Sequence, residues 1–80
     1  MDDAIVEEKL LKCFSAVFPE LSPAAIASAT IENTSGWDSI AQVTLLTLLG
    51  EEFAIEIDFD RFSGAASFAE FAAAMRELLI

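Results

Sequence analysis

Hydrophobic residues recur at helical spacing in three stretches of the chain. The first stretch runs from Asp3 to about Phe18, and its apolar positions are Val6, Leu10, Phe14 and Val17. Because these positions are three or four residues apart, they predict an amphipathic helix with one side facing a core. Pro19 predicts the end of this helix, since the residue before a proline avoids helical backbone.

The second stretch, Ser39 to Phe53, carries two apolar faces. The first face consists of Leu45, Leu46, Leu49 and Phe53, and the neighbouring face consists of Ile40, Val43 and Thr47. A surface helix normally needs one apolar face. The pattern leaves two explanations open: the helix is packed on both sides, or its second face meets a partner.

The third stretch begins with a capping box, in which the Ser67 hydroxyl and the Glu70 carboxylate each accept a backbone N–H of the first turn. The helix that follows has an inner face made of Phe68, Phe71, Ala72, Met75 and Leu79.

Two connections join these helices. Residues 19–38 form a long loop with one embedded helical turn, which Ser22 and Pro23 begin as cap and first residue. We expect its apolar residues to hold the loop against the core; these are Ile26, Ile31 and Trp37. Residues 55–60 alternate apolar and acidic side chains, but no second strand is visible to pair with them. They are therefore interpreted as an extended link into a short helical turn near Asp60–Ser63.

The predicted fold is all-α: a small bundle of three main helices and one short helix, with a long first loop. Eighty residues suffice for one domain spanning 1–80 and leave no room for a deep substrate cleft.

Charge and missing residue types narrow the possible functions. The chain has 14 acidic and 4 basic residues and a net charge of −10, which opposes nucleic-acid binding and favours partners with basic surfaces. It has no histidine, which excludes histidine-based nucleophilic catalysis. Cys13, the single cysteine, cannot form an internal disulfide and is expected to be a small core residue.

Neither a metal site nor a membrane segment is expected. Asp58 and Asp60 begin like a calcium loop, but Phe62 stands where a ligand is needed and Ser63 where the sharp turn needs glycine. The uncharged runs are too short to cross a bilayer, and the acidic start lacks the basic charge of a signal peptide.

Candidate chemistry lies in the segment Gly36-Trp37-Asp38-Ser39-Ile40, a flexible turn that leads into a helix N-terminus. Backbone N–H groups at such a terminus favour a phosphate attached to a serine. The structural alternative is a plain N-cap, because Ser39 and Gln42 have capping-box spacing. Asp38 is a second candidate for the cap, which would leave Ser39 at the first helical position; the sequence does not separate the two.

The whole chain resembles the acyl carrier proteins. Asp38-Ser39-Ile40 is similar to the family's Asp-Ser-Leu/Ile motif at the start of its second helix, with Gly36 shortly before it. Downstream similarities are Leu49, Glu51-Glu52-Phe53 at the end of that helix, Ile57 before a short third helix, and Ser67-Phe68 at the start of the fourth.

The resemblance implies a carrier that is not an enzyme. Ser39 would bear 4′-phosphopantetheine, transferred from coenzyme A by a separate Mg²⁺-dependent phosphopantetheinyl transferase. The thiol of that group would hold acyl intermediates as thioesters for enzymes of fatty-acid, polyketide or related lipid biosynthesis. Asp38 would support the site as a cap or as a contact of the transferase and its metal. The resemblance further implies a cytoplasmic monomer.

Departures from the family pattern point to a specialised pathway. Fatty-acid-synthase carriers have acidic residues two and five positions after the serine, where this chain has Ala41 and Thr44. Trp37 resembles the residue found in discrete carriers of specialised pathways. We therefore expect docking through an apolar face with acidic flanks, made of Ile40, Val43, Thr47, Glu51, Glu52 and Glu56.

One alternative function needs no prosthetic group. The same charge and second apolar face would suit an acidic helical adaptor that binds a basic protein, with Ser39 acting only as a helix cap.

Overall fold

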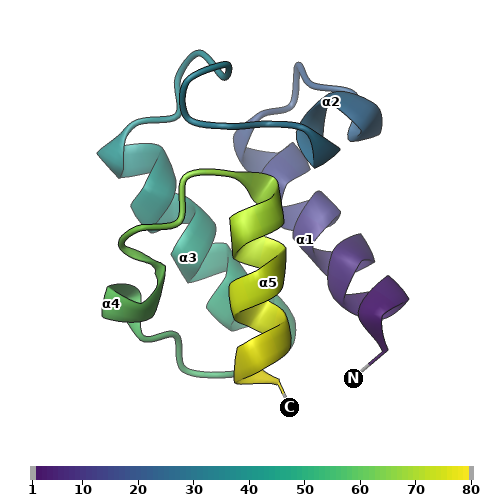
Figure 1. The fold of residues 1–80 in the computed structure, drawn as a ribbon, viewed down its shortest axis with the longest axis vertical. Helices are drawn as coiled ribbons and strands as arrows, with labels where there is room; N and C mark the ends of the chain where they lie inside the picture. Colours follow the sequence, from purple (N-terminus) through teal and green to yellow (C-terminus); the bar gives the residue numbers. More distant parts are fainter. Residues whose placement is uncertain (1, 80) are drawn as a thin grey trace.

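The computed structural model describes residues 2–79. Its helices, shown in Figure 1, are α1 (Asp3–Val17), α2 (Pro23–Ala27), α3 (Ser39–Phe53), α4 (Phe59–Phe62) and α5 (Phe68–Leu78). The all-α prediction is confirmed, with three long helices and two short ones. The part of the chain that the structure describes forms no strand, only an isolated antiparallel bridge between Thr30 and Ser67.

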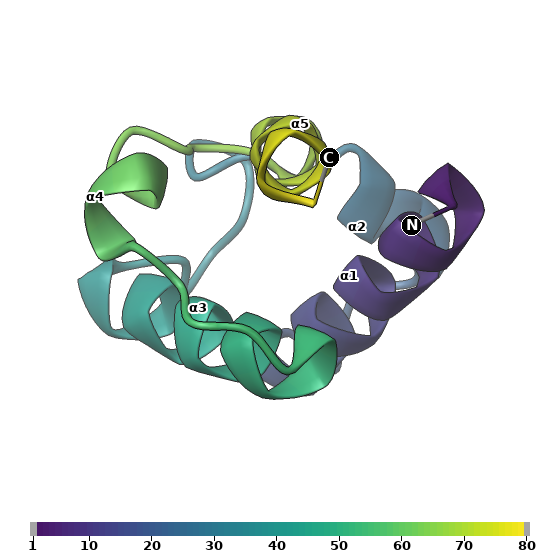
Figure 2. The same ribbon diagram turned by 90° about the horizontal axis from the view of Figure 1, so that it is seen from below.

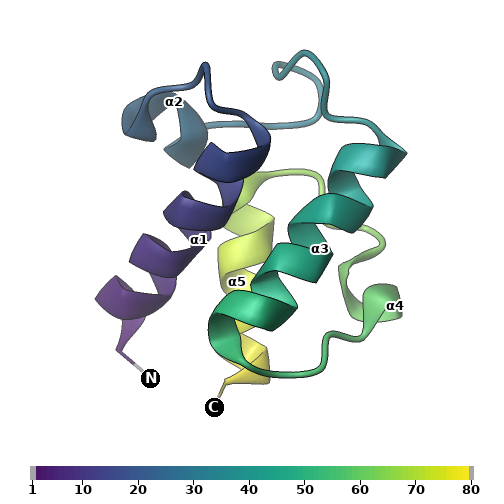
Figure 3. The same ribbon diagram turned by 180° about the vertical axis from the view of Figure 1, so that it is seen from behind.

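The long helices surround a common core. α1 runs in the opposite direction to α3 and α5 and packs against both (Figures 1 and 3). Seen from below, α1, α3 and α5 occupy three sides of the bundle and α4 the fourth, beside the first half of α3 (Figure 2). The loop between α2 and α3 crosses the end of the bundle where α5 begins (Figure 1).

Aromatic rings fill the centre of the bundle. The Phe14 ring is fully buried and meets the rings of Trp37, Phe68 and Phe71 edge-on, at centroid distances of 5.5, 5.1 and 5.4 Å. Such edge-to-face pairs add to the stabilisation that comes from burying the rings themselves. The predicted core stripe of α3 is confirmed, and so are Phe68, Phe71, Ala72 and Met75 on the inner face of α5. Leu79, predicted with them, follows the end of α5 and is partly buried.

The first loop is held to the core by different groups from those predicted. Ile26 and Trp37 are buried, as expected, but the Ile31 side chain is 42% exposed, so the prediction that it holds the loop is wrong. Backbone hydrogen bonds do this instead: the Ile31 N–H donates to the Ala66 carbonyl at 2.9 Å, and the Phe68 N–H donates to the Ala29 carbonyl at 3.0 Å. Because these bonds use main-chain atoms, no hydrophobic pattern reveals them.

The link from α3 to α4 turns sharply. Ala54 ends α3 in the left-handed region, with φ of 54°. Asp58 then caps α4 by accepting the Asp60 N–H at 3.0 Å. The short helix predicted near Asp60–Ser63 therefore exists and begins at Phe59. No helix among residues 2–79 is long and apolar enough to cross a membrane.

Candidate functional site

Asp38 caps the N-terminus of α3. Its carboxylate accepts the Ala41 backbone N–H at 2.9 Å, while its own backbone stays extended, as an N-cap requires. Ser39 is consequently the first residue of α3 and is exposed. Within the described residues no hydrogen bond engages the Ser39 side chain, and of the two capping alternatives the structure has Asp38.

The turn that leads to Ser39 is fixed on one side by a buried tryptophan. Gly36 has φ of +88°, a left-handed value that glycine adopts without steric cost. Trp37 is only 5% exposed, and its backbone N–H donates to the Thr34 carbonyl at 3.3 Å. A flexible glycine and a rigid anchor therefore stand directly before the Asp38-Ser39 pair.

Gln42 does not form the capping box with Ser39 that its spacing allows. Its side-chain oxygen accepts the Trp37 indole N–H at 2.8 Å, and its side-chain nitrogen donates to the carbonyls of Phe62 and Ala65 at 3.2 and 3.3 Å. The local sequence pattern does not reveal this role, because both carbonyls lie twenty or more residues away.

A hollow of about 310 Å³ opens beside Ser39. It lies where the first loop, the start of α3 and the segment after α4 meet, and its lining residues are Ile31, Trp37, Asp38, Ser39, Gln42, Ser63 and Ala65. Ser39 thus borders open space, which leaves room beside it for an attached group.

The second apolar face of α3 is not covered by any other part of the described chain. Ile40 is 76% exposed and Val43 is 49% exposed, with Thr47 exposed one turn further on. The Thr47 hydroxyl bonds to the Val43 carbonyl at 2.9 Å, which occupies this polar group within the helix. The open question about this face is therefore answered in part: the helix is not packed on both sides.

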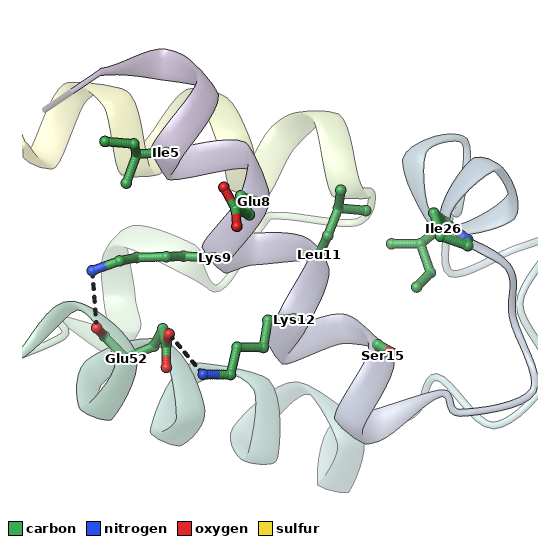
Figure 4. Close-up of a pocket in the computed structure, with 9 residues that line it drawn as sticks. Ile5, Glu8, Lys9, Leu11, Lys12, Ser15, Ile26 and Glu52 are labelled. Carbon is green, nitrogen blue, oxygen red and sulfur yellow. Dashed lines mark hydrogen bonds and ion pairs between the residues drawn. The ribbon is translucent and has the colours of Figure 1, made fainter.

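The three predicted acidic residues do not all lie on the exposed face of α3. Glu51 is exposed and follows Thr47 by four residues, so it continues the apolar face, whereas Glu56 is exposed in the link after α3. Glu52 instead faces α1, where its carboxylate lies 3.2 Å from the Lys12 ammonium. The Glu52 carbonyl accepts a 3.4 Å hydrogen bond from Lys9 (Figure 4).

A larger hollow, of about 530 Å³, lies along α1 and away from Ser39 (Figure 4). It is lined by residues of α1, the start of α2 and the end of α3, and none of the residues at the α3 N-terminus takes part. The Lys9 and Lys12 side chains reach towards Glu52: the Lys12 ammonium pairs with the Glu52 carboxylate, and the Lys9 ammonium donates to the Glu52 backbone carbonyl.

No reactive group accompanies Ser39. The Asp38 carboxylate is occupied by the helix cap. Cys13 is buried in the core, and burial together with the nearby Glu52 charge raises the pKa of its thiol to about 11, so it is a poor nucleophile. No three potential ligands gather into a metal site in residues 2–79. The site can receive a group on Ser39 but holds no base to activate the hydroxyl.

These features fit a phosphodiester-linked prosthetic group. The hydroxyl is exposed and free, and the backbone N–H groups of the first turn of α3 lie close to where a phosphate on Ser39 would sit. Residues 8–75 match the family described as PP-binding, phosphopantetheine attachment site. No curated protein matches the chain.

A match over this span covers most of the chain, including all of α3. Family membership implies a phosphopantetheinyl transferase and processing enzymes as partners. The chain belongs to the phosphopantetheine attachment site family and is a carrier, not a catalyst, whose prosthetic group is phosphopantetheine.

Proposed function

We propose that the protein is an acyl carrier protein, a single domain of residues 1–80 in which Ser39 bears the phosphopantetheine. One observation carries this proposal: Asp38 makes the helix cap, which leaves the neighbouring Ser39 hydroxyl exposed and unbonded at the α3 N-terminus. When bound, the group supplies a thiol that holds acyl chains as thioesters.

The modification step requires an external base. Ser39 Oγ bonds to the phosphorus that carries pantetheine in coenzyme A, and the pyrophosphate P–O bond breaks to release the adenosine-bisphosphate half. The serine proton passes to a group of the transferase, since this chain contains no histidine and Asp38 is engaged as a cap. A carboxylate repels a neighbouring phosphate, so Asp38 would not bind the prosthetic group directly. It would support the site by capping α3.

Partner enzymes would dock on the exposed face of α3. Ile40, Val43 and Thr47 supply apolar surface that begins next to Ser39 and extends about two turns along α3, and Glu51 supplies charge at its far end. Glu56 adds charge from the link after α3. Glu52 would contribute less, because Lys12 offsets its charge.

The pathway is proposed to be specialised lipid, polyketide or related biosynthesis rather than general fatty-acid synthesis. Position 41 is a buried alanine and position 44 an exposed threonine, so α3 carries no acidic side chain between Ser39 and Gly50. Basic docking surfaces of general fatty-acid enzymes would find little to pair with there. We place the carrier in the cytoplasm as a monomer, as the resemblance to acyl carrier proteins implies.

Intact-mass measurement tests the proposal. The protein is incubated with coenzyme A, Mg²⁺ and a broad-specificity phosphopantetheinyl transferase, alongside Ser39→Ala and Ser63→Ala. Ser63 is the matched control, because it is another exposed serine that lines the same hollow. We expect one phosphopantetheine on the wild type and on Ser63→Ala, and none on Ser39→Ala. A folded wild type that several transferases leave unmodified would favour the adaptor function instead.

A further inference from the structure

The Gln42 amide joins three separate segments of the molecule. Its oxygen accepts the Trp37 indole N–H at 2.8 Å. Its nitrogen donates to the carbonyl of Phe62, the last residue of α4, at 3.2 Å, and to the carbonyl of Ala65 at 3.3 Å. Both donors of the amide nitrogen and the acceptor oxygen are thus engaged, which makes this a fully used side chain at the edge of the core.

The bond between Trp37 and Gln42 spans the modification site along the chain. Trp37 lies two residues before Ser39, and Gln42 lies three residues after it. The tryptophan ring is itself fixed, with its centroid 5.5 Å from that of Phe14 and 6.0 Å from that of Phe71. The segments before and after Ser39 are therefore hydrogen-bonded to each other, and the packed Trp37 ring holds them against the core.

The other two bonds fix the opposite wall of the hollow beside Ser39. Phe62 is fully buried against Phe71, with ring centroids 5.5 Å apart, and Ala65 lies on the hollow together with Ser63. Gln42 is the side chain that links this wall to α3 by hydrogen bonds. The Gln42 amide thus holds the turn before Ser39 and residues 62–65 in a fixed position relative to each other.

We propose that Gln42 is a positioning residue for the modification of Ser39, a role that rests on the proposed function of that serine. The transferase must bring the Ser39 hydroxyl into line with the pyrophosphate of coenzyme A. If the turn and residues 62–65 move independently, only a fraction of molecules present the hydroxyl correctly, and the apparent affinity falls by that fraction. Only an amide suits the position, because it accepts from an indole N–H and donates to two carbonyls.

Three substitutions distinguish the hydrogen bond between Gln42 and Trp37 from the two hydrogen bonds that Gln42 donates to Phe62 and Ala65. Gln42→Met keeps the length of the side chain and removes all three bonds. Gln42→Glu keeps an acceptor for Trp37 and loses both donors, whereas Trp37→Phe removes the indole donor together with part of a buried ring. The control is Ser22→Ala, which removes a helix cap at α2, away from Ser39. It lowers stability and leaves the three hydrogen bonds of Gln42 unchanged.

The measurement is kcat/KM of phosphopantetheine transfer, taken well below the unfolding temperature on variants that circular dichroism shows to be folded. We expect a loss of about tenfold for Gln42→Met, mostly through KM, and a smaller loss of about threefold for Gln42→Glu. Ser22→Ala should stay within about twofold of the wild type. Hydrogen exchange of the Trp37 indole N–H, followed by NMR, should be faster in Gln42→Met and little changed in Gln42→Glu.

Other results would refute either the positioning role of Gln42 or the attachment to Ser39. Transfer to Gln42→Met at the wild-type rate would refute the positioning role and leave Ser39 as the attachment residue. An equal loss in Ser22→Ala would show that stability alone is measured, which also refutes it. If Gln42→Met fails to fold, Gln42→Glu and Trp37→Phe carry the test. Absence of transfer to the wild type would instead refute the proposed function itself.

Discussion

The Asp38 carboxylate accepts the Ala41 backbone N–H at 2.9 Å, and this bond leaves the hydroxyl of the adjacent Ser39 free. Two neighbouring polar residues thus have separate roles at the start of α3. One stabilises the helix, and the other is exposed at its first position, beside an open hollow. A serine that also capped the helix would lose a stabilising bond whenever it was modified, and this arrangement avoids that conflict.

The division of roles predicts different stabilities for two alanine variants. Asp38→Ala should lower the free energy of unfolding by about 0.5–2 kcal/mol, because the α3 N-terminus loses its cap. Ser39→Ala should change it by less than about 0.5 kcal/mol, since an exposed, unbonded side chain is removed. Urea unfolding measures both, with Asp38→Asn as the control that retains capping ability. Equal losses in the two alanine variants would contradict the assignment of the cap.

We predict that replacing Gly36 lowers the stability of the protein, because of its backbone conformation. Its φ of +88° disfavours any residue with a Cβ, although no heavy atom lies within 4 Å of where that Cβ would be. Gly36→Ala should therefore cost about 1–2 kcal/mol through backbone strain alone. Gly64→Ala is the matched control, because Gly64 also has open space around it but no left-handed φ. Thermal unfolding of both variants measures the difference, and a Gly36→Ala variant as stable as Gly64→Ala would contradict the prediction.

Cys13 should be slow to react in the folded protein. Burial, with the Glu52 charge second, raises the pKa of its thiol to about 11 from its ordinary value of 9.0. At about pH 8 the thiolate fraction then falls by about 100-fold, and alkylation by iodoacetamide should slow at least as much relative to protein in urea. Fast labelling of Cys13 in the folded, unmodified protein would contradict this, whereas the modified protein should gain one fast thiol on its prosthetic group.

The same shift gives a dependence of stability on pH with a definite sign. The thiol's pKa is higher in the folded state than in the unfolded state, so its stabilising contribution is complete below about pH 9. That contribution should be lost as the pH rises towards about 11. Urea unfolding at several pH values measures the loss, and Cys13→Ala should lack this part of it. Identical pH profiles for the two proteins would show that the thiol does not contribute.

The exposed apolar face of α3 predicts how partners respond to mutation and to salt. Ile40→Ala and Val43→Ala should lower kcat/KM with the transferase by about fivefold or more, because each removes apolar area from the proposed interface. Ile5→Ala, an exposed isoleucine on α1, is the control and should have no effect. Since Ile40, Val43 and Thr47 carry no charge, the rate should vary little as ionic strength rises from about 0.05 to 0.3 M. A steep decline with salt would show that charged residues dominate docking.

Much of the fold could be predicted because hydrophobic spacing and caps specify helices locally. The bounds Ser39 and Phe53 of α3 are those that the sequence indicates, and the Ser67 cap of α5 forms with a 3.1 Å bond to the Glu70 N–H. Ile31 shows the limit of this reasoning: its hydrophobicity suggested burial, but its backbone N–H is the group that attaches the loop.

The site was predictable only in part, because side-chain direction depends on distant segments. Gln42 has the spacing of a capping-box partner for Ser39, yet α4 and Trp37 offer its amide three better bonds. Glu51 and Glu52 look equivalent in the sequence, but one helical step turns Glu52 towards Lys12. Neither outcome follows from local pattern, since each requires knowing which helices are neighbours.

Tandem mass spectrometry of the modified protein tests directly whether Ser39 bears the phosphopantetheine. The wild type is treated with transferase and coenzyme A and digested, and the fragments then locate the added group among the seven serines of the chain. We predict a single phosphopantetheine on Ser39, within the peptide that contains Trp37 and Gln42. A group on any other residue, or none on folded protein after treatment with several transferases, would contradict it.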